Sequence, residues 1–349
     1  MQEWRRTVAL SRIPITGSYR YRDVLQVLPA EATAPRPPAL LNDHPFVLEY
    51  RFESADTDRK LPQGQVTPKW IVSNERSGYK QNELLLLMTT FTSGRLFQYS
   101  NKQAWFIPMG TQNMEPASKQ VQWGQEGYYY DGSTAEIRSF SEVTSKEIER
   151  VDPQEYFNRY GWCIDRDFDL PANIDLMFDS YCSLSDEARH AFLSSCSLFD
   201  QDISMWANHP SLSFAALVSS LETLIAYNHR ETAVEKCKCC GQDRYLVVKK
   251  FRDFFGRYGS DVPEFRKYAA KIYRHRSKLL HRGELFLGEV ALRRFGTFDG
   301  SEDDMLRLNL VRTCRICVVN WRLSQRENAQ QSHPVDREDA AADACHSAS

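Results

Sequence analysis

The sequence predicts an α+β protein in two parts: a β-rich N-terminal domain, residues 1–145, and an all-α helical bundle, residues 184–323. Short apolar or alternating runs separated by turn residues fill the first part. From Leu184 onward, apolar residues recur at helical spacing instead. Residues 146–183, interrupted by Pro171, are expected to be a linker segment. The tail, residues 324–349, is expected to be disordered because its composition cannot bury an apolar face.

The strands expected in the first part are short and lie between turns such as Asn42-Asp43, Ser77-Gly78 and Ser93-Gly94. They are VALSRIPI, FVLEYRFE, KWIVSN, ELLLLMTTFTS, RLFQYSN and AWFIPM, with a hairpin in YYYDGSTAEIRSF at 128–140. The many aromatic residues here are expected to form the core and faces of a sheet, because aromatic residues are favoured in strands. Stacking on nucleic-acid bases is the alternative. The role of this domain is left open.

The helices of the second part follow from apolar stripes and end signals. Ser185 is a candidate N-cap for a helix that ends before Pro210, and a second apolar helix follows it. A third is expected near 245–258, a fourth over 264–282 that ends at Gly283, and a last one from Leu306 to Trp321. Several helices joined by short connections predict a bundle. The aspartates between 165 and 179 do not match a calcium-binding loop and are expected to be solvated.

Composition places the chain among globular proteins. Of its 349 residues, 42% are hydrophobic and 26% charged, and the net charge is −2, which excludes an overall basic field. The longest apolar run, residues 84–88, is far too short to span a membrane, and the start lacks the apolar core of a signal peptide. A cytoplasmic location is therefore expected.

The fourth predicted helix, EFRKYAAKIYRHRSKLLHRGELF, carries an unusual arginine. Arg276 falls within the apolar stripe, where a permanent charge needs a partner. Arg274, Ser277 and His281 lie on a neighbouring face, and His281 is in the last turn. Histidine suits proton transfer near neutral pH, and arginine suits phosphate recognition. One alternative is structural: Arg276 is a buried partner of Glu222 on the second helix, and His281 caps a helix end. Glu222 itself either completes a polar site or lies on a solvated edge.

The string IYRHRSKLLHRGELF, preceded by the apolar helix SFAALVSSLETLIAYN, resembles the Apea-like branch of the HEPN superfamily over residues 184–323. That superfamily's motif is an arginine, four to six residues, then a histidine. Arg276 and His281 fit it with a spacer of four, and Arg274 and His281 with a spacer of six. Catalytic members often carry Asn, Asp or His after the arginine, where this chain has Ser277.

The resemblance implies a metal-independent endoribonuclease that acts as a homodimer, in defence against phage or as a toxin. His281 would be the general acid or base, and Arg276 would bind the phosphate at the dimer seam. Ser277 would orient His281 or the phosphate, Arg274 would be a second phosphate ligand, and Glu222 would complete the site. The partners would be RNA, tRNA included, and a trigger recognised by the N-terminal domain; no cofactor would be required. The alternative is a catalytically inactive HEPN dimerisation or binding module.

Two further features carry weaker hypotheses. Arg274, Arg276, Lys278 and Arg282 belong to a basic cluster in which His275 is expected to face solvent. Nine cysteines in a protein of this kind favour reduced thiols or metal binding over a disulfide framework. Four of them form two Cys-x-x-Cys pairs that suit a structural zinc ion, namely Cys237, Cys240, Cys314 and Cys317. The last two also fit the apolar stripe of the final helix, where cysteine packs as a small hydrophobe.

Overall fold

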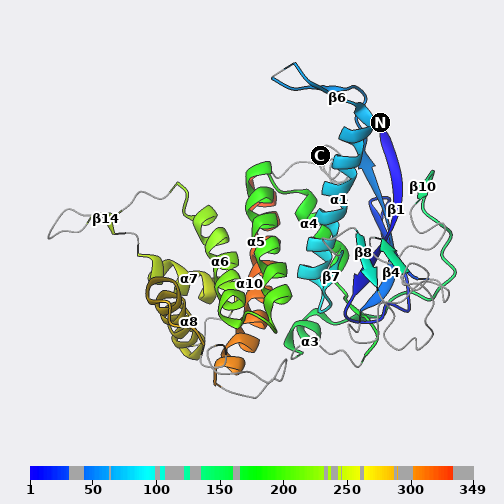
Figure 1. Cartoon of the computed structure of the whole chain (residues 1–349). Coiled ribbons are helices and arrows are strands. Elements are labelled where there is room, and N and C mark those ends of the chain that lie inside the picture. Colours follow the sequence, from blue (N-terminus) through cyan, green and yellow to red (C-terminus); the bar gives the residue numbers. More distant parts are fainter. Residues whose placement is uncertain are drawn as a thin grey trace. The chain divides into compact units, whose positions relative to one another are not determined.

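The computed structural model (Figure 1) describes residues 1–30, 43–62, 64–98, 103–106, 122–125, 135–159, 166–231, 235–236, 243–244, 246–259, 263–286, 289 and 302–332. The chain divides into two compact units. We call them the sheet unit, within Met1–Val151 and Trp162–Ala172, and the helical unit, within Asp152–Gly161 and Asn173–Ala344. An antiparallel sheet in the first and helices in the second confirm the α+β class at this coarse level.

The sheet unit is built on antiparallel strands in the order β10-β1-β4-β3-β2, with β7 also paired to β1. Their bounds are β1 Gln2–Ser11, β2 Tyr19–Tyr21, β3 Leu25–Pro29, β4 His44–Glu53, β7 Leu96–Phe97 and β10 Ala135–Ile137. In the long pairing of β1 with β4, Val8 lies opposite Val47, and β3 pairs Leu25 with Tyr50. All four of these side chains are buried, so both faces of the central strands are covered. The strand expected at FVLEYRFE is confirmed.

The strands expected at KWIVSN and ELLLLMTTFTS are wrong, because both segments belong to the helix α1, Lys69–Phe91. A short apolar run does not distinguish a buried strand from a buried helix. Here Leu84, Leu87, Met88 and Phe91 are almost fully buried along one side of the helix. The Tyr50 hydroxyl of β4 lies 2.7 Å from the hydroxyl of Ser77, which links α1 to one face of the sheet (Figure 1).

Shorter pairings complete the sheet unit. The strands β5 Arg59–Lys60 and β6 Val66–Thr67 form a hairpin that projects beyond the start of α1 (Figure 1). The strands β8 Gln103–Phe106 and β9 Gln122–Gln125 pair antiparallel, and β11 Arg150–Val151 pairs parallel with β12 Leu170–Pro171. Of the hairpin expected at 128–140, residues 128–134 lie outside the described residues, and Ala135–Ile137 pairs with β1.

The helical unit confirms the helical pattern expected from residue 184 onward. Its elements are α3 Pro153–Asn158, α4 Ile174–Cys182, α5 Asp186–Met205, α6 Pro210–Asn228, β13 Glu235–Lys236, β14 Asp243–Arg244, α7 Val247–Tyr258, α8 Pro263–Arg282 and α10 Glu302–Ser332. Helix α5 packs on α6 and α7 packs on α8, while α10 contacts α3, α4, α5, α6 and α7. Trp321 of α10 is fully buried, stacked on Phe192 of α5 and edge-on to Tyr227 of α6.

Local end signals set the helix bounds as expected. The Ser185 hydroxyl accepts a hydrogen bond from the Ala188 amide at 3.3 Å and caps α5. Gly283 follows α8 with φ of +67°, the left-handed conformation that a glycine adopts readily. The last helix runs to Ser332, beyond residue 324 where the tail was expected to begin.

Residues 146–183 are not a plain linker. Their strands β11 and β12 belong to the sheet unit, whereas α3 and α4 belong to the helical unit. Of the aspartates expected to be solvated, Asp167 is exposed, whereas Asp169 is buried and pairs with Arg166 at 3.3 Å. Asp152 accepts hydrogen bonds from the Gln154 and Glu155 amides and caps α3. Asp152 thus starts a helix while its side chain remains exposed.

Helix α6 is the one helix among the described residues that is long and apolar enough to cross a membrane, and two-thirds of the relevant window is buried within the protein. Its apolar residues Phe214, Leu217, Val218, Leu221 and Leu224 are almost fully buried. This is the burial expected for a core helix of a bundle.

Candidate functional site

Helix α8 carries most of the residues expected to act, and its apolar face fixes it in the helical unit. Ala269 and Ile272 are fully buried, and the helix packs on α6 and α7. The Tyr268 hydroxyl donates a hydrogen bond to the Leu306 carbonyl of α10 at 2.8 Å. Burial raises the pKa of that hydroxyl far above its usual range, so it stays a donor at neutral pH. The remaining faces of α8 are free to present polar groups.

Arg276 meets Glu222. The Nη2 atom of Arg276 lies 2.9 Å from Oε2 of Glu222 on α6, and the two side chains are 19% and 22% exposed. The guanidinium also lies 5.8 Å from the ring centre of Tyr273, one turn earlier. Partial burial, with the nearby Glu222 carboxylate, raises the pKa of the Tyr273 hydroxyl. The structure thus brings together two of the predicted site residues, in the contact that the structural alternative describes.

Arg274, Ser277 and His281 share another face of α8. Arg274 and His281 are exposed, and Ser277 between them is half-buried. His281 lies seven positions after Arg274, which is about two helical turns or about 10 Å along the axis. Among the described residues, none makes a hydrogen bond or an ion pair with these three side chains. They form an open polar stripe, and Arg276 points away from it toward α6.

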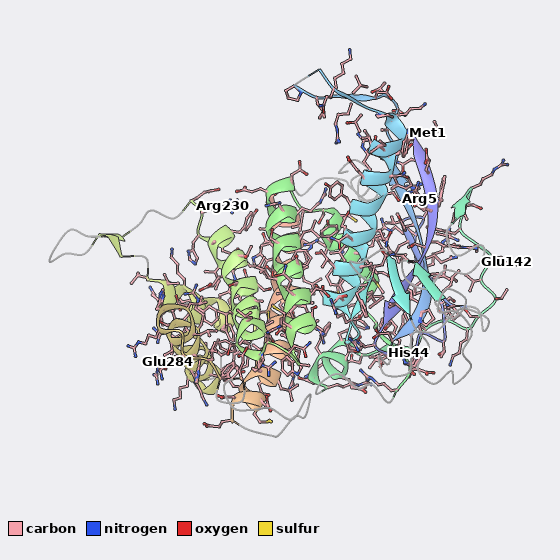
Figure 2. All side chains as sticks on the ribbon, in the orientation of Figure 1. Met1, Arg5, His44, Glu142, Arg230 and Glu284 are labelled. Carbon is pink, nitrogen blue, oxygen red and sulfur yellow. The ribbon has the colours of Figure 1, made fainter. Side chains whose placement is uncertain are left out.

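The chain just after His281 is anchored. Glu284 lies 3.4 Å from Lys278 and 3.6 Å from Arg282, past the end of α8 (Figure 2). Phe286 is buried, and its amide donates a hydrogen bond to the Ser211 hydroxyl of α6 at 2.9 Å. Its ring lies edge-on to Phe214 at 5.3 Å. These contacts limit how far the last turn of α8 can move.

His275 lies against this anchor, so the expectation that it faces solvent is wrong. Its ring is half-buried, 6.5 Å from Phe214 and 6.2 Å from Phe286 between ring centres. Partial burial lowers its pKa, and the charges of Lys271, Lys278 and Arg274 lower it further against the opposing Asp303. A neutral imidazole therefore packs as an aromatic ring. The sequence held a signal for this, since His275 falls three residues after buried Ile272.

The helical hairpin around the site is strongly basic. Residues 247–282 hold eleven Lys and Arg against three Asp and Glu, in a chain with a net charge of −2. Lys267, Arg274, Lys278 and Arg282 are exposed along α8. Some pair with carboxylates at longer range, such as Lys271 with Glu302 at 3.4 Å. Exposed pairs of this kind are weak and leave the positive field largely in place. The hairpin suits a polyanion.

The predicted zinc ligands divide between core and undescribed residues. Cys314 and Cys317 are fully buried on α10, and burial raises the pKa of both thiols. The Cys314 thiol faces the Leu217 carbonyl at 3.7 Å. Cys237 and Cys240 lie outside the described residues. Within the described ranges, no group of three or more His, Cys, Asp or Glu could hold a metal ion. The zinc site stays a prediction, while Cys314 and Cys317 pack in the core.

The other cysteines vary in state. Cys196 is buried and is not disulfide-bonded. Cys182, at the end of α4, is disulfide-bonded, so the expectation of reduced thiols is wrong at this position. A thiol pattern in sequence fixes neither the partner nor the oxidation state, because bridging depends on the distance between Cα atoms in the folded chain.

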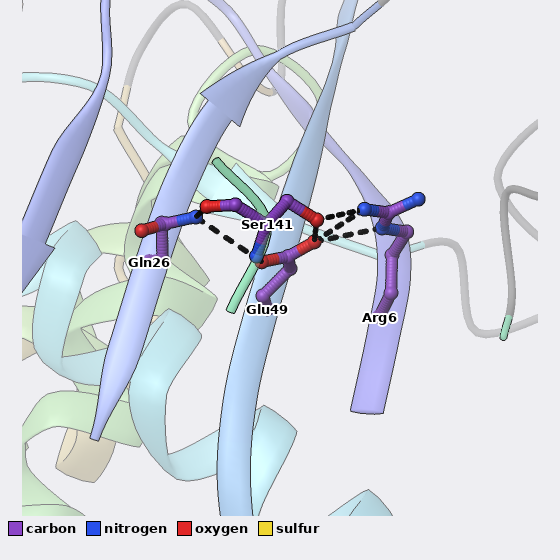
Figure 3. A network of polar contacts seen from close by, with 4 residues as sticks. All are labelled: Arg6, Gln26, Glu49 and Ser141. Carbon is purple, nitrogen blue, oxygen red and sulfur yellow. Dashed lines mark hydrogen bonds and ion pairs between the residues drawn. The ribbon is translucent and has the colours of Figure 1, made fainter. Parts of the chain in front are cut away.

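Sequence reasoning missed a polar network in the sheet unit. Glu49 of β4 is fully buried and accepts hydrogen bonds from Nε and Nη2 of Arg6 at 2.8 and 2.6 Å (Figure 3). Gln26 donates to the same carboxylate at 3.1 Å, and Ser141 donates through its amide at 2.9 Å and its hydroxyl at 2.6 Å. Register explains the arrangement, since Arg6 and Gln26 lie opposite Glu49 on the two neighbouring strands. The network ties three strands to the segment after β10.

Comparison with known proteins adds no assignment. No protein-family model matches the sequence, and neither a curated protein nor a solved structure matches the chain. The site is therefore judged from its own residues, charge and geometry.

Proposed function

We propose that this protein is a metal-independent endoribonuclease whose site lies on the exposed stripe of α8. The observation that carries the proposal is the arrangement of Arg274, Ser277 and His281 on one face of α8, within the basic segment of residues 247–282. A permanent cation, a hydroxyl and an imidazole on one open surface are the groups that phosphodiester cleavage needs. The resemblance of residues 184–323 to the Apea-like HEPN branch supports the same activity.

In the proposed reaction a base removes the proton of an RNA 2′-hydroxyl, and that oxygen attacks the neighbouring phosphorus. The bond from phosphorus to the 5′-oxygen breaks, and an acid protonates the leaving oxygen. The products are a 2′,3′-cyclic phosphate and a 5′-hydroxyl. His281 is the acid or base, because imidazole accepts and donates protons near neutral pH. A homodimer would supply a second His281 for the opposite proton transfer.

Arg274 and Arg276 have different proposed roles. Arg274 faces the same open stripe as His281, so it is the proposed ligand of the scissile phosphate, with Ser277 orienting the phosphate between them. Arg276 is tied to Glu222 and holds α8 against α6 in this proposal. Its guanidinium would bind phosphate only by exchanging that carboxylate for the substrate.

The broader role follows the resemblance. The protein would act in the cytoplasm, in defence against phage or as a toxin, with RNA such as tRNA as its substrate. The sheet unit would bind the trigger or restrain the nuclease. The basic hairpin of residues 247–282 supports a polyanionic partner.

The test is cleavage of a mixed RNA pool that includes tRNA, by purified protein in excess EDTA. We expect cleavage with cyclic-phosphate ends, reduced about 100-fold or more in His281→Ala and in Arg274→Ala. The matched control is His190→Ala, which removes an exposed histidine of α5 and should cleave as the wild type does. Full activity of His281→Ala, or loss of wild-type cleavage in EDTA, would refute the proposal.

A catalytically inactive dimerisation or binding module is the second candidate, and the Arg276–Glu222 ion pair favours it. An arginine of the motif that is already paired within its own subunit needs no phosphate partner. Overexpression separates the two candidates. Toxicity that His281→Ala relieves supports the nuclease, whereas equal growth of both strains supports the binding module.

A further inference from the structure

Helices α4, α5 and α10 surround a group that we call the arginine cluster: Arg189, Arg322 and Arg326. Arg322 of α10 is 0% exposed. In the described part of the chain, its Nε, Nη1 and Nη2 atoms are all buried and have no hydrogen-bond partner. Its backbone carbonyl accepts a hydrogen bond from the Ser180 hydroxyl at 3.2 Å, which fixes α10 against α4 at this point. A guanidinium is therefore held in the interior with its donors unused.

The charges around Arg322 do not neutralise it. Burial lowers its pKa to about 9, so the side chain remains cationic at neutral pH. Arg326 and Arg189 contribute to this lowering, whereas Tyr181 and Cys196 oppose it. No carboxylate is among these groups, and Tyr181 and Cys196 are neutral at pH 7 in their ordinary state. The cluster thus concentrates positive charge around Arg322.

The other two arginines lie nearer to solvent. Arg189 is 13% exposed and donates to the Cys182 and Leu184 carbonyls, but its buried Nε has no partner. Its acidic neighbour Asp186 is 97% exposed and 3.8 Å away, so it compensates little. Arg326 is one turn after Arg322 on α10, and its buried Nη1 is also without a partner. All three guanidiniums keep unused donors among the described residues.

An unpaired buried charge is costly, and it persists where a counter-ion completes the site. The planar fork of arginine matches the oxygens of phosphate, and several cations together favour a multiply charged anion. We propose that the arginine cluster binds a phosphate group, either inorganic phosphate or the phosphomonoester end of a small ligand. Arg322 contacts it at the inner end, and Arg189 and Arg326 contact it on the side of the solvent. The cluster shares no residue with the stripe on α8.

Thermal unfolding of the full chain tests the proposal. Phosphate is titrated against sodium chloride at equal ionic strength, with AMP as a second probe. At about 100 times the dissociation constant, phosphate should raise the unfolding temperature by about 5 °C. A larger rise with AMP identifies the phosphomonoester as the better ligand, and an equal or smaller rise identifies free phosphate. Equal unfolding temperatures in chloride, phosphate and AMP would overturn the proposal.

Variants locate the effect. Arg322→Met keeps the length and apolar stem but removes the charge, so the response to phosphate should disappear. Arg312→Met is the control, because Arg312 lies on the same helix and donates to the Phe157 carbonyl and Asn158 instead. It should respond as the wild type does. If Arg322→Met does not fold, Arg326→Met replaces it and should weaken phosphate binding at least tenfold by calorimetry. An unchanged phosphate response in the folded variant would place any bound phosphate elsewhere and refute the site.

Discussion

Glu49 in the sheet unit and Asp202 in the helical unit are both fully buried carboxylates, but their surroundings differ. Glu49 accepts five hydrogen bonds from Arg6, Gln26 and Ser141. Asp202 of α5 accepts one, from the Ser213 hydroxyl, and its Oδ2 has no partner among the described residues. Burial raises the pKa of Asp202 to about 7, although Ser213 and the charge of Arg307 oppose the shift.

Backbone geometry accounts for the contrast. In the sheet, side chains opposite each other on neighbouring strands form a row, so Arg6, Glu49 and Gln26 meet without further adjustment. In the bundle, the backbone amides of each helix form hydrogen bonds within that helix. A buried carboxylate therefore depends on side-chain donors from the facing helix. Arg307 of α10 divides its donors between the Trp206 carbonyl, Ser213 and Asp304. Both oxygens of the Glu49 carboxylate therefore have donors, whereas Asp202 in the helical unit keeps an oxygen that a proton can still satisfy.

The largest effect should come from removing the carboxylate of the Glu49 network. Glu49→Ala leaves the Arg6 charge, the Gln26 amide and the Ser141 amide without their acceptor, and should lower the free energy of unfolding by about 5 kcal/mol. Urea unfolding followed by tryptophan fluorescence measures it. The control Glu142→Ala removes an exposed carboxylate beside the network (Figure 2) and should change stability by less than about 0.5 kcal/mol. A loss below about 1 kcal/mol for Glu49→Ala would show that the hydrogen bonds to this carboxylate contribute little to the stability of the protein.

Asp202, with one oxygen unpaired among the described residues, should make the free energy of unfolding depend on pH. Because folding raises the pKa of Asp202 above the unfolded value of 3.8, the folded state holds the extra proton between these values. The stabilising contribution is therefore complete below about pH 4 and is lost as pH rises through about 7, by as much as roughly 4 kcal/mol. Asp202→Asn should flatten this part of the curve of unfolding free energy against pH. A slope unchanged in the variant would assign the pH dependence to another group.

The smallest effect should come from the pair that is neither fully buried nor fully exposed. Arg276 and Glu222 retain about a fifth of their exposure, so solvent screens their attraction. A double-mutant cycle of Arg276→Met and Glu222→Gln should give a coupling of about 0.5–1 kcal/mol by urea unfolding. A coupling of about 3 kcal/mol or more would place this pair with the Glu49 network and make it part of the core.

The parts of the fold that could be predicted were those that depend on the spacing of residues close together in the sequence. Ser185 and Gly283 mark helix ends through their own side chain or backbone, and apolar periodicity located α5, α6 and α8. Alternation located β4. The apolar run in α1 was compatible with a strand or a helix, and only packing on the sheet decides between them.

The site could also be predicted only in part. Arg276 within an apolar stripe required a partner, and Glu222 was the partner considered. His275 was missed because Phe214 and Phe286, which enclose it, come from other segments. The Glu49 network was also missed, since its donors come from residues 43 and 92 positions away in the chain. Such contacts follow from strand register, which single-sequence patterns do not give.

The position of α10 has a consequence for synthesis. This helix contacts α3, α4, α5, α6 and α7, and its Leu306 carbonyl holds Tyr268 of α8. Chains emerge from the ribosome N-terminus first, so α8 is exposed before its supporting helix exists. The core around Trp321 closes only after that residue has been translated. Under the proposed function, the nascent chain would therefore remain inactive beside the ribosomal RNA until α10 has been translated and has packed on the other helices.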